Sequence, residues 1–577
     1  MNRSLTYAFL ISLPVFGLAC AGPERDLLDG RDDPFPTGKA DSIAAGSAEA
    51  LAVLALVNDP ATTLEILDDD ARLHRTAAAN IIEHRDGPSG LFDTLAELDS
   101  VSYVGPFALG QLLQYAIETG FLAPGPGKFV DVIFSPQSYD SSHNARVAQL
   151  IDDAQHTVDV AMYSFSDAQI SDALEAAVER GVKVRFVFET GNDDRKKTGA
   201  DLLTSKSGRL EQMGINVRYV NKIMHHKFVI VDGPRDDQSR AHTAIVASGS
   251  GNWSFGAATK YDENTLLFSG YPELALRLQN EFNLLWEHSR DVVVDADLPY
   301  ELSGLVIGDI ADSPDVHAFF TSDNFDVSGT TFKKTGRDTI STAWVEAIEN
   351  ATESIRIASG HLRSRPISEA VMAKAAQNPG IDIRIYLDGQ EYISEFYQGQ
   401  QDSDLAECLA GATTDTQIRN CTDKGFYFGY DVGEIAGVPV RYKYYSYRWH
   451  YSYADQMHHK YMVIDGDELY TGSYNLSNNA ERNTFENTLA FSGPDHADLV
   501  AAYESNFETL WDTERDGLLD ELRTEIETAD SIPLVFESMA LTWSEITSLK
   551  ELIRDNCADI NTQDFRVHPD KHKFCPR

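Results

Sequence analysis

Hydrophobic and polar residues follow the same order in two distant parts of the chain. Apolar residues alternate with others in VDVAMYSF (158–165) and again in IRIASGHL (355–362), as they do along a half-buried β-strand. Each run leads into an amphipathic helical pattern that ends at a glycine, Gly181 in the first copy and Gly380 in the second. A second apolar run follows each helix. This strand–helix–strand order predicts a parallel or mixed sheet with helices on its faces, built twice.

The same periodicities divide the rest of the chain. Residues 46–122 show helical periodicity with little strand character, whereas residues 21–45 are polar and rich in Pro and Gly. We therefore predict an α/β protein with two duplicated domains, preceded by a small all-α domain. The expected parts are a signal peptide at 1–20, a flexible linker at 21–45, the helical domain at 46–122, lobe 1 at 125–310, lobe 2 at 311–520, and a helical extension with a cysteine pair at 521–577.

Part of the helical domain, residues 78–116, resembles a helix-hairpin-helix unit with the hairpin VSYVG (101–105). In members of that family that bind DNA, backbone N–H groups of the hairpin hold a phosphate. Residues 51–120 contain 3 Arg against 11 Asp and Glu, a net charge of −8, so the basic neighbours that a phosphate contact needs are missing. A DNA-binding unit and a small packing or spacing module are both open, and the charge favours the second.

The whole chain is strongly acidic. Its 577 residues include 48 Lys and Arg against 90 Asp and Glu, which gives a net charge of −42. Such a surface repels polyanions at long range and argues against a general nucleic-acid binder. A small positive pocket inside an acidic surface is still compatible with this charge.

The N-terminus has the features of an export signal. Arg3 precedes an apolar run at 5–18, which is too short to span a bilayer comfortably. The letters GLAC resemble a bacterial lipoprotein box in which Cys20 is lipidated, although Gly17 stands where a larger aliphatic residue is usual. A lipoprotein of the bacterial envelope and a freely secreted protein both fit, with a buried N-terminal helix as the structural alternative.

Four further cysteines suit an oxidising compartment. Proximity predicts the disulfides Cys408–Cys421 and Cys557–Cys575, although four cysteines allow three pairings. An even number of cysteines besides Cys20 agrees with export.

One ten-residue segment occurs twice, as MHHKFVIVDG (224–233) and MHHKYMVIDG (457–466). Both copies have the spacing H-x-K-x4-D, and both are followed by Gly-Ser-x-Asn and then by Glu-Asn. The members are His225, Lys227, Asp232, Ser250, Asn252 and Glu263 in the first copy, and His458, Lys460, Asp465, Ser473, Asn475 and Glu486 in the second. A coincidental strand with polar ends would explain one motif, but not two with matched partners.

The repeated side chains suit a tetrahedral phosphate. Residues two apart on a strand point to the same side, so each motif places an imidazole beside an ammonium group. Two copies facing each other across one cleft would supply a nucleophile, a proton donor, and cationic and amide donors for the oxygens. Each Glu is expected to bind Nδ1–H of the histidine in its own half, which pairs Glu263 with His225 and Glu486 with His458. Because the lysines neutralise the phosphate, we predict no metal and no other cofactor.

These motifs resemble the phospholipase D superfamily in its two-motif, single-chain form, over residues 130–515. The resemblance implies two tandem α/β sandwich lobes, related by a pseudo-twofold axis, that share one active site and form a covalent phosphohistidine. It makes His225 and His458 the nucleophile and the general acid, with His225 expected as the nucleophile. The residues implied to bind the phosphoryl group are Lys227, Lys460, Ser250, Asn252, Ser473 and Asn475.

Other motif residues are expected to be structural. Asp232 and Asp465 should hold loops together rather than take part in the chemistry. His226 and His459 lie one residue away from the reactive histidines and should point to the opposite face of the strand.

Residues 390–456 depart from an exact duplication. They include the tyrosine-rich run RYKYYSYRWHYSYADQ (441–456). It reads either as a strand or hairpin that packs over the cleft, or as a wall of the substrate entrance. Aromatic rings suit a lipid–water interface and a choline-type cation, and they also stack on bases.

The reaction type is better determined than the substrate. Export, acidic charge and the aromatic insertion favour a monomeric phospholipase D that hydrolyses or transphosphatidylates a glycerophospholipid, such as zwitterionic phosphatidylcholine, at a membrane surface. A secreted endonuclease acting on DNA or RNA is the alternative that the hairpin unit favours, and a phosphatidyltransferase is another. A binding module without activity is disfavoured, because both halves keep every motif residue.

Overall fold

The computed structural model describes residues 48–119, 128–189, 194, 197–292, 307, 310, 313–511 and 515–577. The expected signal peptide and linker, with Cys20, lie outside the described residues. Within the described ranges, no helix combines the length and the apolar character that crossing a bilayer requires.

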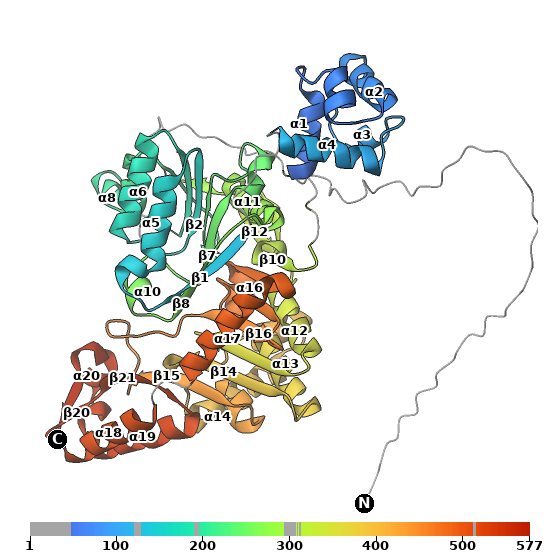
Figure 1. Ribbon diagram of the computed structural model, residues 1–577. Coiled ribbons are helices and arrows are strands. Elements are labelled where there is room, and N and C mark those ends of the chain that lie inside the picture. Colours follow the sequence, from blue (N-terminus) through green and yellow to red (C-terminus); the bar gives the residue numbers. More distant parts are fainter. Residues whose placement is uncertain are drawn as a thin grey trace, which may run out of the picture. The chain divides into compact units, whose positions relative to one another are not determined.

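The first lobe is built on an eight-stranded mixed sheet with the strand order β1-β8-β7-β6-β2-β3-β4-β9 (Figure 1). Its strands are β1 (Phe129–Ser135), β2 (Thr157–Met162), β3 (Lys183–Phe188), β4 (Asn216–Tyr219), β6 (Lys227–Val231), β7 (Ile245–Gly249), β8 (Glu263–Ser269) and β9 (Arg290–Asp291). The neighbours β2, β3 and β4 run parallel, as the strand–helix–strand pattern predicts, and the remaining pairs are antiparallel. The main helices are α5 (His143–Asp153), α6 (Ala168–Glu179) and α11 (Pro272–Glu287).

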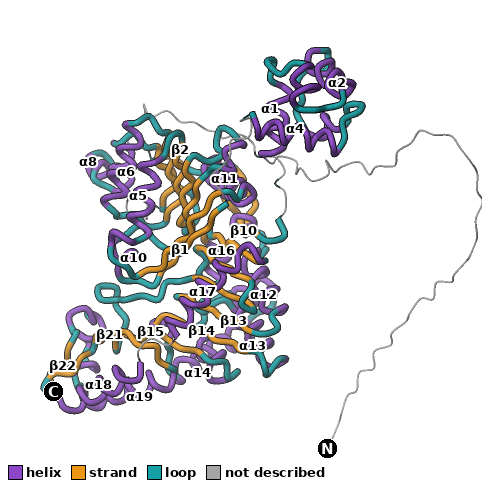
Figure 2. The backbone as a smooth tube through the Cα atoms, in the orientation of Figure 1, coloured by secondary structure: helices purple, strands orange, loops and turns teal. Residues whose placement is uncertain are grey.

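The second lobe repeats this topology with the strand order β10-β19-β17-β16-β13-β14-β15-β21. Its strands are β10 (Val316–Phe320), β13 (Ser354–Ser359), β14 (Asp382–Asp388), β15 (Val440–Ser446), β16 (Lys460–Ile464), β17 (Glu468–Gly472), β19 (Asn487–Ser492) and β21 (Val535–Leu541). Its helices include α12 (Thr339–Asn350), α13 (Arg365–Gln377) and α17 (Ala497–Trp511). Figure 2 shows the strands of each lobe with helices beside them. Two α/β lobes with equivalent sheets confirm the predicted fold class.

Alternating side chains on the motif strands explain the layers of the two lobes. On β6, Val229 and Val231 pack in a core with α5 and α6, whereas Phe228 and Ile230 pack on the other face with α11. On β16, the side chains facing away from α12 and α13 join the same core as α11, together with α17. One hydrophobic core is therefore shared by both lobes, and its burial joins the halves of the duplication.

Residues 521–577 were predicted to be helical, and that prediction is incomplete. They contain strands as well as helices. In chain order, these are the end of α18 (Arg515–Thr528), β20 (Ser531–Pro533), β21, α19 (Trp543–Asn556), α20 (Gln563–Val567) and β22 (Phe574–Pro576). Strand β21 pairs antiparallel with β15 and ends the second sheet, in the place that β9 takes in the first. A boundary at residue 520 therefore cuts through the sheet of lobe 2.

The tyrosine-rich run is largely a sheet strand. Tyr442, Tyr444 and Tyr445 lie on β15 and are buried, because the strand is covered on both faces. The extra length before it forms α14 (Glu395–Gly411) and α15 (Asp415–Thr422). The disulfide Cys408–Cys421 links these two helices, and Cys557–Cys575 links the end of α19 to β22, so both predicted pairs are present.

The described N-terminal part is all helical. It consists of α1 (Ala48–Asn58), α2 (Arg75–Asp86), α3 (Leu95–Asp99) and α4 (Pro106–Glu118) around a hydrophobic core of its own. The segment VSYVG joins α3 to α4, and within it Tyr103 is exposed and adopts a φ of 71°. The shorter elements elsewhere are β5 (Ile223–Met224), α8 (Ala200–Leu203), α9 (Lys206–Gln212), α10 (Phe255–Thr259), β11 (Phe325–Ser328), β12 (Thr331–Lys334), α16 (Asn478–Asn483) and β18 (Thr484–Phe485).

Candidate active site

Each repeated motif begins at the N-terminal end of a buried central strand and is held there by the other lobe. Strand β5, which ends at Met224, pairs in parallel with β18 of lobe 2, and His225 N donates to Phe485 O at 3.0 Å. In the second motif, His458 N donates to Asp262 O of lobe 1 at 2.9 Å. The backbone on both sides of the site is therefore built by the two lobes together.

The carboxylates that orient the histidines come from the opposite lobe. The distance from His225 Nδ1 to Glu486 Oε2 is 2.8 Å, and the distance from His458 Nδ1 to each oxygen of Glu263 is also 2.8 Å. The predicted pairing within each half was wrong. Because each motif lies beside the strand that carries the other half's Glu, the nearer carboxylate belongs to the other half. With Nδ1–H donated to a carboxylate, Nε2 of each imidazole is left for chemistry.

The two motif lysines lie against the same histidines. Lys227 Nζ donates to His225 O and Lys460 Nζ donates to His458 O, each at 2.6 Å. Burial lowers the pKa of Lys227 to about 7 and that of Lys460 to about 8. Burial, followed by the charges of both lysines, lowers the pKa of each histidine well below its usual value. The site thus combines two buried lysines, cationic below their lowered pKa values, with two imidazoles whose neutral form burial favours.

The Gly-Ser-x-Asn turns approach this centre from both lobes. Ser473 Oγ donates to Glu486 Oε2 at 2.8 Å, and Ser250 Oγ accepts from Asn264 N at 2.9 Å. The amide oxygens of Asn252 and Asn475 are buried and make no hydrogen bond within the described part of the chain. Each of these two amides therefore leaves an unsatisfied acceptor oxygen beside the site.

The neighbouring histidines and the motif aspartates point elsewhere. His226 Nε2 donates to Glu281 Oε1 at 2.9 Å, and His459 Nδ1 accepts from Asn264 Nδ2 at 3.1 Å. Asp232 accepts from three consecutive backbone N–H groups that lead into the first residue of β2, and Asp465 does the same at β13. These aspartates fix the loops that precede the central strands and do not face the imidazoles.

Comparison with known proteins agrees with this arrangement. The family described as "Cardiolipin synthase, PLD-like domain" matches residues 147–286 and 344–511, which together make up more than half of the chain and contain both motifs. The chain belongs to the phospholipase D superfamily.

Individual relatives match shorter parts. The mitochondrial cardiolipin hydrolase of Danio rerio is 33% identical over 157 residues, covering 27% of this chain and 61% of the relative. That of Chlamydomonas reinhardtii is 29% identical over 152 residues, covering 26% of this chain and 60% of the relative. The chain thus spans about three fifths of the length of these relatives.

Solved structures with similarity include two bacterial proteins. The phosphatidylserine synthase of Haemophilus influenzae Rd KW20 is 14% identical, with 76% of this chain and 94% of that chain covered and a TM-score of 0.43. Nuc from Salmonella typhimurium is 30% identical, with 28% of this chain and 97% of that chain covered and a TM-score of 0.23.

Several residues beside the superfamily motifs were not predicted. Glu189 after β3 and Asp388 at the end of β14 accept from the backbone N–H of Met224 and Met457, at 2.9 and 2.8 Å. They anchor the residue before each reactive histidine. An acidic residue in the same place of both copies, in VFE and YLD, was the sequence signal for them.

The two halves of the site are not identical. Lys443 Nζ of lobe 2 donates to Asp262 Oδ1 of lobe 1 at 2.9 Å, and both side chains are buried. The corresponding position in the other copy is Phe485, which packs against Phe325 and Phe332. An ion pair therefore joins the lobes beside His458, whereas beside His225 the equivalent position belongs to an aromatic cluster within lobe 2.

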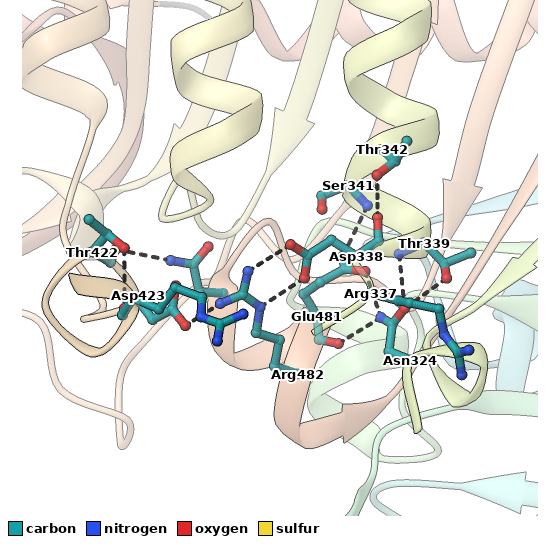
Figure 3. A network of polar contacts seen from close by, with 12 residues as sticks. Asn324, Arg337, Asp338, Thr339, Ser341, Thr342, Thr422, Asp423, Glu481 and Arg482 are labelled. Atoms are coloured by element: carbon teal, nitrogen blue, oxygen red, sulfur yellow. Dashed lines mark hydrogen bonds and ion pairs between the residues drawn. The ribbon is translucent and has the colours of Figure 1, made fainter. Parts of the chain in front are cut away.

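The residues before Glu486 are fixed by a polar network (Figure 3). Glu481 accepts from the backbone N–H groups of Ile340 and Ser341 at the start of α12, at 3.1 and 2.9 Å. Arg482 binds Asp338 with two hydrogen bonds of 2.8 and 2.6 Å and also contacts Asp423. This network ties α16 to the body of lobe 2 and so positions β18, which leads to Glu486.

The lowered lysine pKa values predict how anion affinity changes with pH. Tungstate, a phosphate mimic that stays dianionic at neutral and alkaline pH, should inhibit best when both lysines are protonated. As pH rises through about 7 and 8, Lys227 and Lys460 lose their protons, and Glu263 and Glu486, whose pKa values burial raises to about 7, become charged. Both changes weaken binding, so the inhibition constant should rise roughly tenfold per pH unit. The measurement is inhibition between about pH 6 and 9. An inhibition constant that stays flat over this range would contradict the prediction, and Lys460→Met should flatten the slope.

Proposed function

We propose that the protein is an exported phospholipase D-type phosphodiesterase that hydrolyses a glycerophospholipid through a phosphohistidine. The observation that carries the proposal is the pair of buried imidazoles, each held through Nδ1 by a carboxylate of the other lobe and each beside a lysine. A two-step displacement at phosphorus needs two imidazoles and nearby cations, and here each lobe supplies one imidazole and one lysine.

The proposed reaction has two displacements. Nε2 of His225 attacks phosphorus, and the bond from phosphorus to the headgroup oxygen breaks while His458 donates a proton to that oxygen. The headgroup leaves as an alcohol and the phosphatidyl group stays on His225. Neutral His458 requires a proton at Nε2 for this step, which the negative charge of the bound phosphate favours. A water molecule then gives its proton to His458 and attacks phosphorus, so that the N–P bond breaks and phosphatidate is released.

The substrate class rests on different support. The relatives named above are cardiolipin hydrolases, and the description of the matching family names cardiolipin synthase. The net charge of −42 disfavours polyanions, and the N-terminal sequence favours export. Phosphatidylcholine and related glycerophospholipids are the proposed substrates, at a membrane surface outside the cytoplasm. The resemblance of residues 78–116 to a helix-hairpin-helix unit favours an endonuclease as the second candidate.

One assay separates these candidates. The mature protein would be given phosphatidylcholine vesicles and a single-stranded oligonucleotide in parallel, with EDTA present and His225→Ala as the blank. We expect release of choline while the oligonucleotide stays intact. Cleavage of the oligonucleotide without choline release would make the protein a nuclease and would refute the proposed substrate class.

A further inference from the structure

A groove lies in lobe 2, next to the chain segment that follows β14. Two cavities of about 340 and 770 Å³ adjoin there and have six lining residues in common. These are Gln390, Tyr392, Tyr427, Tyr447, Arg448 and Lys550. We call the combined space the tyrosine groove. Its walls come from the segment after β14, from α14, from the end of β15 and from α19.

The tyrosine groove is cationic although the protein is acidic. Four basic side chains line it, and among its described lining residues Asp404 is the one carboxylate. The basic residues are Lys424, Arg448, Lys550 and Arg554. No ion pair joins any of these four to a carboxylate within the described ranges, although 90 acidic residues are available in the chain. Unpaired cations grouped in a concave site indicate an anionic ligand.

Lys550 is held in place among aromatic rings. Its Nζ lies 4.4 Å from the ring centroid of Tyr447, 5.5 Å from that of Tyr392 and 6.0 Å from that of Tyr444. It donates to Tyr447 O at 2.7 Å, which uses one of the three N–H groups of an ammonium. Burial lowers its pKa to about 8. Lys550 is half-buried, and its two remaining N–H groups have no acceptor within the described structure, so an anionic oxygen would satisfy them.

The groove is connected to the catalytic centre by a short stretch of chain. Asp388, which anchors the backbone of Met457, is followed by Gly389 in the groove wall. Glu391 binds both His361, at 2.9 Å, and Arg363, at 2.6 Å. The guanidinium of Arg363 stacks 4.2 Å over Tyr427, a lining residue. A molecule bound in the groove therefore lies against Gly389, the neighbour of the aspartate that anchors Met457, which directly precedes His458.

The rim of the groove suits a lipid surface better than a nucleic acid. Phe396 and Tyr397, at the start of α14, are 74% and 61% exposed, and Tyr397 is a lining residue. Adjacent exposed aromatic rings of this kind partition to a lipid–water interface. The overall charge of −42 also opposes a long polyanion but not one small anionic group.

We propose that the tyrosine groove binds the headgroup of a glycerophospholipid that carries a second phosphate, while the scissile phosphodiester lies at His225 and His458. The inference rests on the proposed function and adds a substrate preference to it. Lys550 and Arg448 bind the second phosphate, and the tyrosine rings contact the rest of the headgroup. Lys550 and Arg554 lie on α19, beyond the residues 147–286 and 344–511 that match the family. The preference therefore depends on residues of α19 as well as on Arg448 and the tyrosines of lobe 2.

The test compares two lipids that differ by one phosphate, phosphatidylinositol 4-phosphate and phosphatidylinositol, in neutral detergent micelles. For the unaltered mature protein, we expect kcat/KM to be about tenfold or more higher for the first lipid. Lys550→Met and Arg448→Gln should each bring the ratio towards one and leave kcat/KM for phosphatidylinositol nearly unchanged. Lys550→Arg should keep the preference, and Lys333→Met and Arg146→Gln serve as matched controls on exposed cations elsewhere. A ratio near one in the unaltered protein, or a ratio that neither groove variant changes, would overturn the proposal.

A binding measurement separates failure of the groove from failure of the proposed function. Calorimetry with the His225→Ala protein should show that inositol 1,4-bisphosphate binds more tightly than inositol 1-phosphate, and that Lys550→Met removes the difference. If this holds while no lipid is hydrolysed, the groove stands and the phospholipase function fails. If lipid is hydrolysed without any difference in binding, the groove proposal fails alone. Lys550-dependent binding of an oligonucleotide in place of the bisphosphate would also refute it.

Discussion

Turnover should be lost when either reactive histidine is removed. His225→Ala lacks the nucleophile and His458→Ala lacks the proton donor, so each should lower kcat by about 10³-fold or more. Whether a phosphohistidine forms in each variant distinguishes the nucleophile from the proton donor. With a substrate whose leaving group needs no protonation, such as a nitrophenyl phosphodiester, His458→Ala should still form the phosphohistidine and then accumulate it, because no base activates water. His225→Ala should form none.

The measurement is a rapid-quench assay with radiolabelled substrate, followed by location of the acid-labile phosphate in the chain. His317→Ala is the control, because His317 is exposed on β10 and away from the site. His226→Ala should lower the melting temperature, since it removes the bond to Glu281, while the folded protein keeps most of its activity. A phosphohistidine trapped at position 458 would reverse the assignment, and full activity in either His225→Ala or His458→Ala would refute the shared site.

Because each glutamate binds the histidine of the other lobe, its substitution should impair the catalytic step that this histidine performs. Glu263→Gln should behave like a weakened His458, and Glu486→Gln like a weakened His225, because each carboxylate fixes the tautomer of the imidazole in the other lobe. We expect each substitution to lower kcat by about 10²- to 10⁴-fold on a natural lipid. On a nitrophenyl phosphodiester, Glu263→Gln should lose far less in the first step than Glu486→Gln, since that leaving group does not need His458.

Double variants test the same pairing by another route. Glu263→Gln combined with His458→Ala should be no slower than His458→Ala alone, because the carboxylate acts through the histidine that is gone. Glu263→Gln combined with Glu486→Gln should be slower than either single variant. If Glu263→Gln instead had no added effect on top of His225→Ala, the pairing within each half would be restored and the crossed arrangement refuted.

The repeat and its strands could be predicted from local patterns. Period-two alternation in VDVAMYSF and IRIASGHL, followed by helical periods, determines strand and helix with little help from distant residues. The residues of the motif could also be predicted, because His, Lys, Ser and Asn repeated at matched spacing suit a phosphate site. The two sheets, with equivalent strands in equivalent places, confirm the predicted class.

The crossed pairing could not be predicted from one sequence with two equal halves. Glu263 follows His225 in the chain just as Glu486 follows His458, so spacing is the same for pairing within and between the halves. The choice is made by the backbone contacts of β5 with β18 and of Asp262 with Met457, which are long-range. Strand β21 was missed for a related reason. It lies outside the repeat, among helices, and its partner β15 is far away in the sequence.

Because each histidine is oriented by a glutamate of the other lobe, the two halves of the chain must evolve together. A change at Glu486 is felt first by His225, and a change at Glu263 by His458, so compensating substitutions should accumulate between the halves rather than within one. A single lobe that paired with a second copy of itself would satisfy the same geometry, with Glu263 of one copy serving His225 of the other. Two such copies could fuse and then diverge, one side gaining the Lys443–Asp262 ion pair and the other the cluster around Phe485. In the fused chain, neither half would form a complete site without the other.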